Sequence, residues 1–73
     1  MPTFSERLKE LRLSKNIKQN EMANELQVSV RNYQRYEYGI IDIPLSKLIY
    51  IAEYFYVSLD YLVGRTDNPH INK

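Results

Sequence analysis

The 73-residue sequence contains no cysteine, one histidine, two glycines and three prolines. Without cysteine the chain forms neither disulfides nor thiolate metal sites, and His70 cannot build a metal site by itself. No apolar run approaches the roughly 20 residues of a membrane-spanning helix, and the first residues lack the apolar stretch of a signal peptide. These absences predict no metal, no cofactor, no membrane contact and a cytoplasmic location.

The net charge of +1 does not by itself indicate nucleic-acid binding, so the distribution of charge matters more. Between residues 12 and 36 there are five basic and two acidic residues, whereas from residue 38 onward there are three basic and four acidic residues. The first of these regions is therefore mildly basic. Taken alone, this asymmetry fits a mixed solvated surface as well as it fits a basic binding face.

Apolar residues recur at helical spacing along the chain, which predicts an all-α fold of five helices. Thr3 and Glu6 have the spacing of a capping box for the first helix, and Ser58 and Gly64 have the positions of a cap and a stop for the last one. One domain is expected over 1–66, followed by a polar, flexible tail over 67–73. The predicted helices cover about residues 4–15, 19–26, 30–38, 45–55 and 59–63.

The most informative stretch is 19–39, which contains two short helices separated by a tight turn. Met22, Ala23 and Leu26 form the apolar stripe of the first helix, Ser29 stands where the second should begin, and Gly39 where it should end. This arrangement is the sequence form of a helix-turn-helix, a motif that places its second helix in a DNA groove. A small buried residue such as Ala23 is also ordinary in any helical hairpin.

A family resemblance is carried by eight residues and by the end of the last helical region: Gln19, Ala23, Leu26, Val28, Ser29, Tyr33, Glu37 and Gly39, with the ending IAEYFYVSLDYLVG. With these residues, the chain resembles the Cro/phage-repressor type of helix-turn-helix, the xenobiotic-response-element family, over about residues 4–64. The resemblance implies a compact, lambda-repressor-like DNA-binding domain whose recognition helix, about residues 30–38, enters the major groove.

The resemblance gives base reading to four outward positions of the recognition helix. An arginine can bind guanine O6 and N7, a glutamine can bind adenine in the same bidentate way, and a valine can contact a thymine methyl group. Without the motif, an arginine-rich helix face would be read as a solvated surface. The expected base-reading residues are Val30, Arg31, Gln34 and Arg35.

The resemblance also implies contacts to the DNA backbone and one structural ion pair. Gln19 resembles the residue that binds phosphate at the start of the second helix. Arg12 and Glu37 resemble a pair that joins the first helix to the end of the recognition helix, the alternative being two unrelated surface charges. The expected backbone contacts come from Lys15, Lys18, Gln19, Ser29, Asn32 and Tyr38.

The sequence departs from the family pattern at a few positions. Gln27 and Tyr56 stand where the family usually has glycine, so each requires a left-handed backbone or an altered turn. Lys18 replaces the usual Thr or Ser cap. The loop Ile40-Ile41-Asp42-Ile43 lacks the basic residues that related proteins often use to hold the DNA backbone.

Seven tyrosines are many for a chain of this length. Tyr50 and Tyr54 lie off the buried face of the fourth helix, and with Tyr61 and Val63 they could form an exposed apolar surface for self-association. The alternative is scattered surface aromatics. A homodimer on DNA would suit two recognition helices roughly 34 Å apart on successive major-groove faces.

Three classes of function follow. The leading hypothesis is a sequence-specific regulator of transcription that binds a double-stranded DNA operator, expected to be a repressor of phage or mobile-element type. The alternative is an antitoxin-like module that binds a partner protein and regulates its own gene through DNA. An enzyme is not expected, because Ser58, Asp60 and His70 are scattered and show no nucleophile–base spacing.

Overall fold

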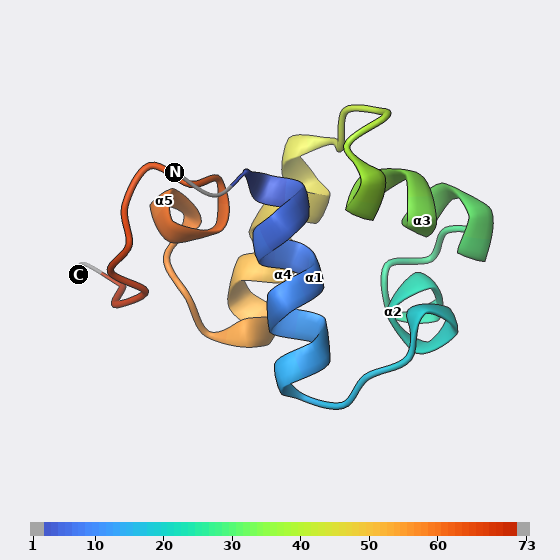
Figure 1. The fold of residues 1–73 in the computed structure, drawn as a ribbon, viewed down its shortest axis with the longest axis horizontal. Coiled ribbons are helices and arrows are strands. Elements are labelled where there is room, and N and C mark those ends of the chain that lie inside the picture. The colour runs from blue at the N-terminus through green and yellow to red at the C-terminus, as the bar shows by residue number, and fades with distance from the viewer. Residues whose placement is uncertain (1–2, 72–73) are drawn as a thin grey trace.

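The computed structural model describes residues 3–71, and in that range the fold is all-α, as predicted. Figure 1 shows α1 crossing the middle of the molecule in front of α4, with α2 and α3 on one side and α5 on the other. No helix in the described range is long and apolar enough to cross a membrane. The helices are α1 (Phe4–Ser14), α2 (Gln19–Glu25), α3 (Val30–Tyr38), α4 (Leu45–Phe55) and α5 (Leu59–Leu62).

Side-chain caps begin three of the helices. In α1 the Thr3 hydroxyl accepts from the Glu6 N–H at 3.3 Å, and the Glu6 carboxylate accepts from the Thr3 N–H at 3.2 Å. These hydrogen bonds with Thr3 hold the pKa of Glu6 below its ordinary value, because they favour the charged carboxylate. Ser29 and Ser58 cap α3 and α5 in the same way through their hydroxyls. The predicted starts of α1, α3 and α5 are confirmed.

Each of the five helices of the described range is followed, one or two residues after its end, by a residue with a left-handed backbone. In each case the next N–H donates to the carbonyl five residues earlier, as Val28 does to Ala23 at 3.0 Å and Val57 does to Ala52 at 2.9 Å. Such a conformation costs a non-glycine residue roughly 1–2 kcal/mol, so the surrounding packing offsets that cost at three positions. The left-handed residues are Asn16, Gln27, Gly39, Tyr56 and Gly64, with φ of 57°, 58°, 73°, 55° and 84°.

The core is apolar and lies between α1 and the other helices. Leu8, Met22, Tyr33, Ile51 and Leu62 are its largest fully buried side chains, one from each helix. Helices α2 and α3 pack on each other, and α1 contacts both α3 and α5. The recognition helix predicted from sequence therefore rests on α1 and α2, which leaves its other side facing outward.

The segment predicted to be a flexible tail makes specific contacts where the structure describes it. Asp67 pairs with Arg7 of α1 at 2.7 Å, and the Pro69 carbonyl accepts from the Ser58 N–H at 2.9 Å. The prediction rested on the polar composition of the tail and on Pro69, and it did not include Arg7, the buried cation of α1 that this segment contacts. Residues 72 and 73 of the predicted tail, like residues 1 and 2 of the predicted domain, lie outside the described range. The mobility of this segment stays a prediction.

Candidate functional site

Helices α2 and α3 form the two arms of a helix-turn-helix, joined by a turn at 26–29. The Leu26 N–H still donates to Met22, and Gln27 then takes the left-handed conformation that stops α2. The Ser29 hydroxyl accepts from the Asn32 N–H at 3.1 Å and so begins α3. The turn is therefore short, and α2 and α3 pack directly on each other.

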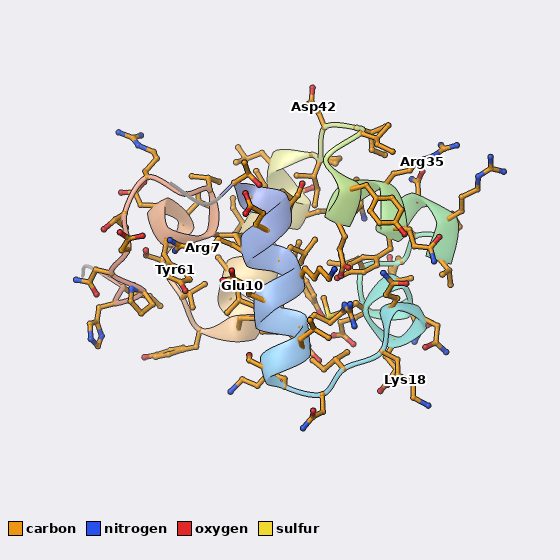
Figure 2. The ribbon with its side chains drawn as sticks, in the orientation of Figure 1. Arg7, Glu10, Lys18, Arg35, Asp42 and Tyr61 are labelled. Carbon is orange, nitrogen blue, oxygen red and sulfur yellow. The ribbon has the colours of Figure 1, made fainter. Side chains whose placement is uncertain are left out.

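One face of α3 is buried and the opposite face is open to solvent. Tyr33 and Tyr36 point into the core, as expected from their spacing, whereas Arg31 and Val30 are exposed. Arg35, Asn32 and Gln34 are half-buried along the flanks of the helix. Figure 2 shows the Arg35 and Lys18 side chains extending away from the bundle on the side of α2 and α3.

The carboxylate of Glu37 is the centre of a buried polar network that joins α1, α2 and α3. Arg12 Nε donates to Glu37 Oε2 at 2.6 Å, and Gln19 Nε2 donates to Glu37 Oε1 at 3.1 Å. The Tyr33 hydroxyl donates to the same carboxylate, and a further Arg12 nitrogen donates to the Ile17 carbonyl at 2.8 Å. Arg12 and Glu37 are each only 7% exposed. The two residues expected to pair do so, as part of a larger network.

The pKa values of these groups follow from their surroundings. Burial opposes ionisation of Glu37, but hydrogen bonds from Arg12, Tyr33 and Gln19 outweigh it and hold the pKa of Glu37 below its ordinary value. The bond to Glu37 raises the pKa of Arg12. Burial, followed by the bond to Glu37, raises the pKa of Tyr33. Arg12 and Glu37 are therefore both charged at neutral pH, and Tyr33 remains a hydrogen-bond donor.

Gln19 connects this network to the recognition helix. Its Oε1 accepts from Gln34 Nε2 at 3.1 Å while its Nε2 donates to Glu37. The link orients the Gln34 amide, leaving the Gln34 oxygen and one of its N–H groups for another partner. Sequence reasoning gave Gln19 and Gln34 separate roles and missed this bond, because residues 15 positions apart on different helices carry no local signal.

A second feature that sequence reasoning missed lies at the end of α3. The Ser5 hydroxyl of α1 donates to the Tyr36 carbonyl at 2.7 Å, and the same carbonyl accepts from the Gly39 N–H at 3.3 Å. Ser5 also restricts Gly39, since a Cβ on that residue would lie 3.1 Å from the Ser5 Oγ. Glycine suits this position for two reasons, because it has no Cβ to approach Ser5 and because it adopts the left-handed φ of 73° without strain.

The residues expected to contact the DNA backbone lie around the same face. Lys15 and Lys18 are exposed, and the Glu21 carboxylate accepts from the Lys18 N–H at 3.1 Å, although Lys18 has no hydroxyl to accept from α2 in return. Ser29 is exposed, and Tyr38 is 67% exposed at the end of α3. The side chains expected to bind bases and backbone are thus gathered on α2, α3 and the residues that precede α2.

The loop after Gly39 adds apolar side chains beside this face. Ile40 is 67% exposed and Ile41 is also exposed, while Ile43 packs against the core. Figure 2 shows Asp42 at the outer end of this loop, away from the helix bundle. The loop between Gly39 and Pro44 therefore offers no cation to a phosphate.

The four residues proposed for self-association differ in their exposure to solvent and in their neighbours. Tyr50 and Tyr54 are exposed on α4 with ring centroids 6.3 Å apart. Tyr61 is half-buried beneath the Arg7 guanidinium, 3.8 Å from the ring centroid, as Figure 2 also indicates. Val63 is half-buried and lines a cavity with Phe4 on α1. The stacked pair on α4 is the exposed part of the predicted surface.

Comparisons with known proteins agree with this architecture. The Helix-turn-helix family profile matches residues 8–62. Two proteins of Bacillus subtilis, the uncharacterized HTH-type transcriptional regulators YobD and YqaE, are 32% and 37% identical over 90% and 93% of this chain. The chain spans 59% of the length of each of these relatives.

A solved structure gives the same result. A crystal structure of a transcriptional regulator from Listeria innocua superimposes with a TM-score of 0.82 at 31% identity, over 97% of this chain and 62% of that protein. The five helices, the tight turn at 26–29 and the family match over most of the sequence lead to one conclusion. The chain belongs to the helix-turn-helix family of the Cro/repressor type.

Proposed function

We propose that this protein is a regulator of transcription that binds double-stranded DNA sequence-specifically, with α3 in the major groove. The observation that carries the proposal is the contrast between the two faces of α3. Its buried face is held by Tyr33 and the Glu37 network, so the exposed face with Arg31 is presented in one orientation. A preorganised helix loses little freedom on binding, which favours specific recognition.

Base reading would use Val30, Arg31, Gln34 and Arg35. Gln34 suits adenine, because its free oxygen can accept from adenine N6 and its remaining N–H can donate to N7. Arg31 and Arg35 suit the two acceptors of guanine, and Val30 suits a thymine methyl group. The hydrogen bond that Gln34 donates to Gln19 supports this interpretation, since it limits the rotation of the Gln34 amide.

The DNA backbone would be held by side chains around α2 and the two ends of α3. The exposed ammonium groups of Lys15 and Lys18 supply the charge. The remaining contacts are smaller and polar, from Gln19, Ser29, Asn32 and Tyr38. Because each phosphate contact releases counterions, affinity should fall steeply between low and moderate salt.

We also infer that the protein acts as a homodimer on its operator and represses transcription by excluding RNA polymerase, as a regulator of phage or mobile-element type would. Self-association would use the exposed Tyr50–Tyr54 pair, together with Tyr61 and Val63 of the predicted surface. Sedimentation that finds a monomer at high concentration, both free and on DNA, would contradict the dimer.

The proposed function is tested by selecting bound duplexes from a random pool. The expected result is a recurring half-site, repeated with two-fold symmetry about one helical turn apart. Recovery of unrelated sequences, bound equally well, would contradict sequence-specific binding. The selected duplex then serves for every binding measurement described below.

The first variant to measure on that duplex is Arg31→Ala. If Arg31 reads a guanine, the variant should lose about 1–3 kcal/mol of binding free energy and accept all four bases at one position of the site. Fluorescence polarisation with the selected duplex and its three single-base variants measures both effects. An equal loss on every sequence would make Arg31 a phosphate contact instead.

A second function, binding of a partner protein in an antitoxin-like manner, is favoured by one observation. Tyr38, Ile40, Ile41 and Leu45 expose apolar side chains along and beside the loop between α3 and α4. Double substitution of Ile40 and Ile41 by serine separates the two functions. Unchanged DNA affinity with loss of a co-purifying small protein would favour partner binding, and loss of DNA affinity would favour a role of the loop on DNA.

A further inference from the structure

Helix α4 reaches the helix-turn-helix through two side chains. Lys47 Nζ donates to the Leu26 carbonyl at 2.7 Å, and the Tyr50 hydroxyl donates to the Glu25 carboxylate. Glu25 is the last residue of α2, and Leu26 is the first residue of the turn at 26–29, so both acceptors lie where α2 meets the turn. The donors lie one helical turn apart on α4, so the same face of α4 contacts the end of α2 twice.

The position of Lys47 is unfavourable for its own helix. A cation in the first turn of α4 opposes the positive end of that helix dipole, whereas a cation at the C-terminal end of α2 is favoured. The Lys47 side chain is half-buried, and its ammonium group lies at the C-terminal end of α2, where it donates to Leu26. Its charge is therefore better explained by the contact with Leu26 than by a role within α4.

The Leu26 carbonyl has no donor within α2, since the last carbonyls of a helix lack intrahelical partners. Two of its neighbours are satisfied by the turn itself, because Val28 donates to Ala23 and Gln27 donates to Asn24. Lys47 supplies a donor for Leu26 from outside the motif. The bond adjoins Gln27, whose left-handed backbone needs support from its surroundings.

We propose that Lys47 is a positioning residue for DNA reading. Its bond to Leu26 holds the turn, and with it the N-terminal end of α3, in the geometry that presents Val30 and Arg31 to the major groove. The Glu37 network holds the other end of α3, and Tyr50 assists Lys47 through Glu25. The proposal rests on the proposed function and adds to it the part played by α4.

The test compares Lys47→Met and Lys47→Arg on the selected duplex and on an unrelated duplex, across a salt series. Methionine keeps the length of the stem without the ammonium group, and arginine keeps a cationic donor. Lys47→Met should weaken specific binding by about tenfold and leave non-specific binding within about twofold. Lys47→Arg should keep most of the specific affinity that Lys47→Met loses. Tyr50→Phe, which keeps the ring, should show a smaller loss in the same direction.

The matched control is Lys15→Met, which removes a cation proposed to contact phosphate. That variant should weaken binding to both duplexes and reduce the slope of log affinity against log salt by about 1, whereas Lys47→Met should leave the slope unchanged. Amide chemical shifts of residues 27–31 should change in Lys47→Met and remain in place in Lys15→Met. The binding measurements are made below the melting temperature of the least stable variant, as followed by circular dichroism.

Each outcome decides a different question. Unchanged specific affinity in Lys47→Met, with wild-type protein binding normally, would overturn the positioning role alone. A salt slope reduced by about 1 in Lys47→Met would make Lys47 a phosphate contact and also overturn it. If the wild-type protein selects no duplex, the proposed function fails, and the positioning role fails with it.

Discussion

Two buried arginines of α1 hold opposite sides of the molecule in different ways. Arg12 binds α3 through Glu37, whose side chain is 1% exposed, whereas Arg7 binds the C-terminal segment through Asp67, whose side chain is 82% exposed. Arg7 gains its other contacts from the carbonyls of Tyr61 and Thr66 at 3.1 and 3.2 Å. Arg12 thus has a buried carboxylate and one backbone carbonyl as partners, whereas Arg7 has an exposed carboxylate, two backbone carbonyls and an aromatic ring.

The difference matters because burial decides what a charge contributes. A buried pair that loses one member leaves an uncompensated charge, which is far more costly than the loss of an exposed pair. The Arg12 side supports the recognition helix, so the proposed DNA-binding surface depends on the more sensitive of the two contacts. The Arg7 side holds the segment after α5 and can lose its carboxylate with little effect.

The largest expected effect comes from Glu37→Gln. The substitution leaves Arg12 charged, buried and without a carboxylate, so the free energy of unfolding should fall by about 3–5 kcal/mol. For a domain of this size the melting temperature should fall by more than about 10 °C. Glu10→Gln, at an exposed position of α1, is the matched control and should melt as the wild-type protein does. A melting temperature unchanged by Glu37→Gln would show that the buried pair contributes no stability.

A smaller loss is expected from Arg7→Met. Methionine keeps the apolar stem of the side chain, but the Tyr61 and Thr66 carbonyls lose their hydrogen-bond donor. The free energy of unfolding should therefore fall by about 1–3 kcal/mol. Asp67→Asn is the matched control and should cost less than about 1 kcal/mol, because the carboxylate it removes is exposed. Urea unfolding measures both. Equal losses in the two variants would mean that the Asp67 charge, and not the backbone carbonyls, carries the contribution of Arg7.

The dependence of stability on pH sharpens the comparison further. The folded state lowers the pKa of Glu37 below its ordinary value of 4.5, so near and below that pH the unfolded state binds more protons than the folded state. The stabilisation from Glu37 is therefore complete above pH 4.5 and is lost as the pH falls through the lowered pKa. The difference in melting temperature between wild type and Glu37→Gln should narrow below pH 4.5. A constant difference down to pH 2 would contradict the lowered pKa.

Much of the fold was predictable because its signals are local. The capping box of Thr3 and Glu6, the serine caps and the glycine after α3 act over three or four residues, and the predicted helices agree with the observed ones to within about one residue. The left-handed backbone at Gln27 and Tyr56 was one of two alternatives left by the sequence. The structure selects it, because the same terminal hydrogen-bond pattern ends all five helices of the described range.

The candidate site was predictable only in part. Its location on 19–39, its outward residues and the pairing of Arg12 with Glu37 followed from the motif and the resemblance. The bond between Gln19 and Gln34, and the bond between Lys47 and Leu26, join residues 15 and 21 positions apart. No periodicity or cap connects such residues, since their proximity depends on how the helices pack.

By itself, the sequence determined where the helices begin and end, which of their faces are apolar, and that two of them form a helix-turn-helix. These properties depend on backbone conformation and on interactions between near neighbours. Only the tertiary structure decided which polar groups meet: Gln19 with Gln34, Arg7 with the segment after α5, and Lys47 with the end of α2. The physical reason is that a buried polar group must find a partner wherever packing places one, and that partner can come from any part of the chain.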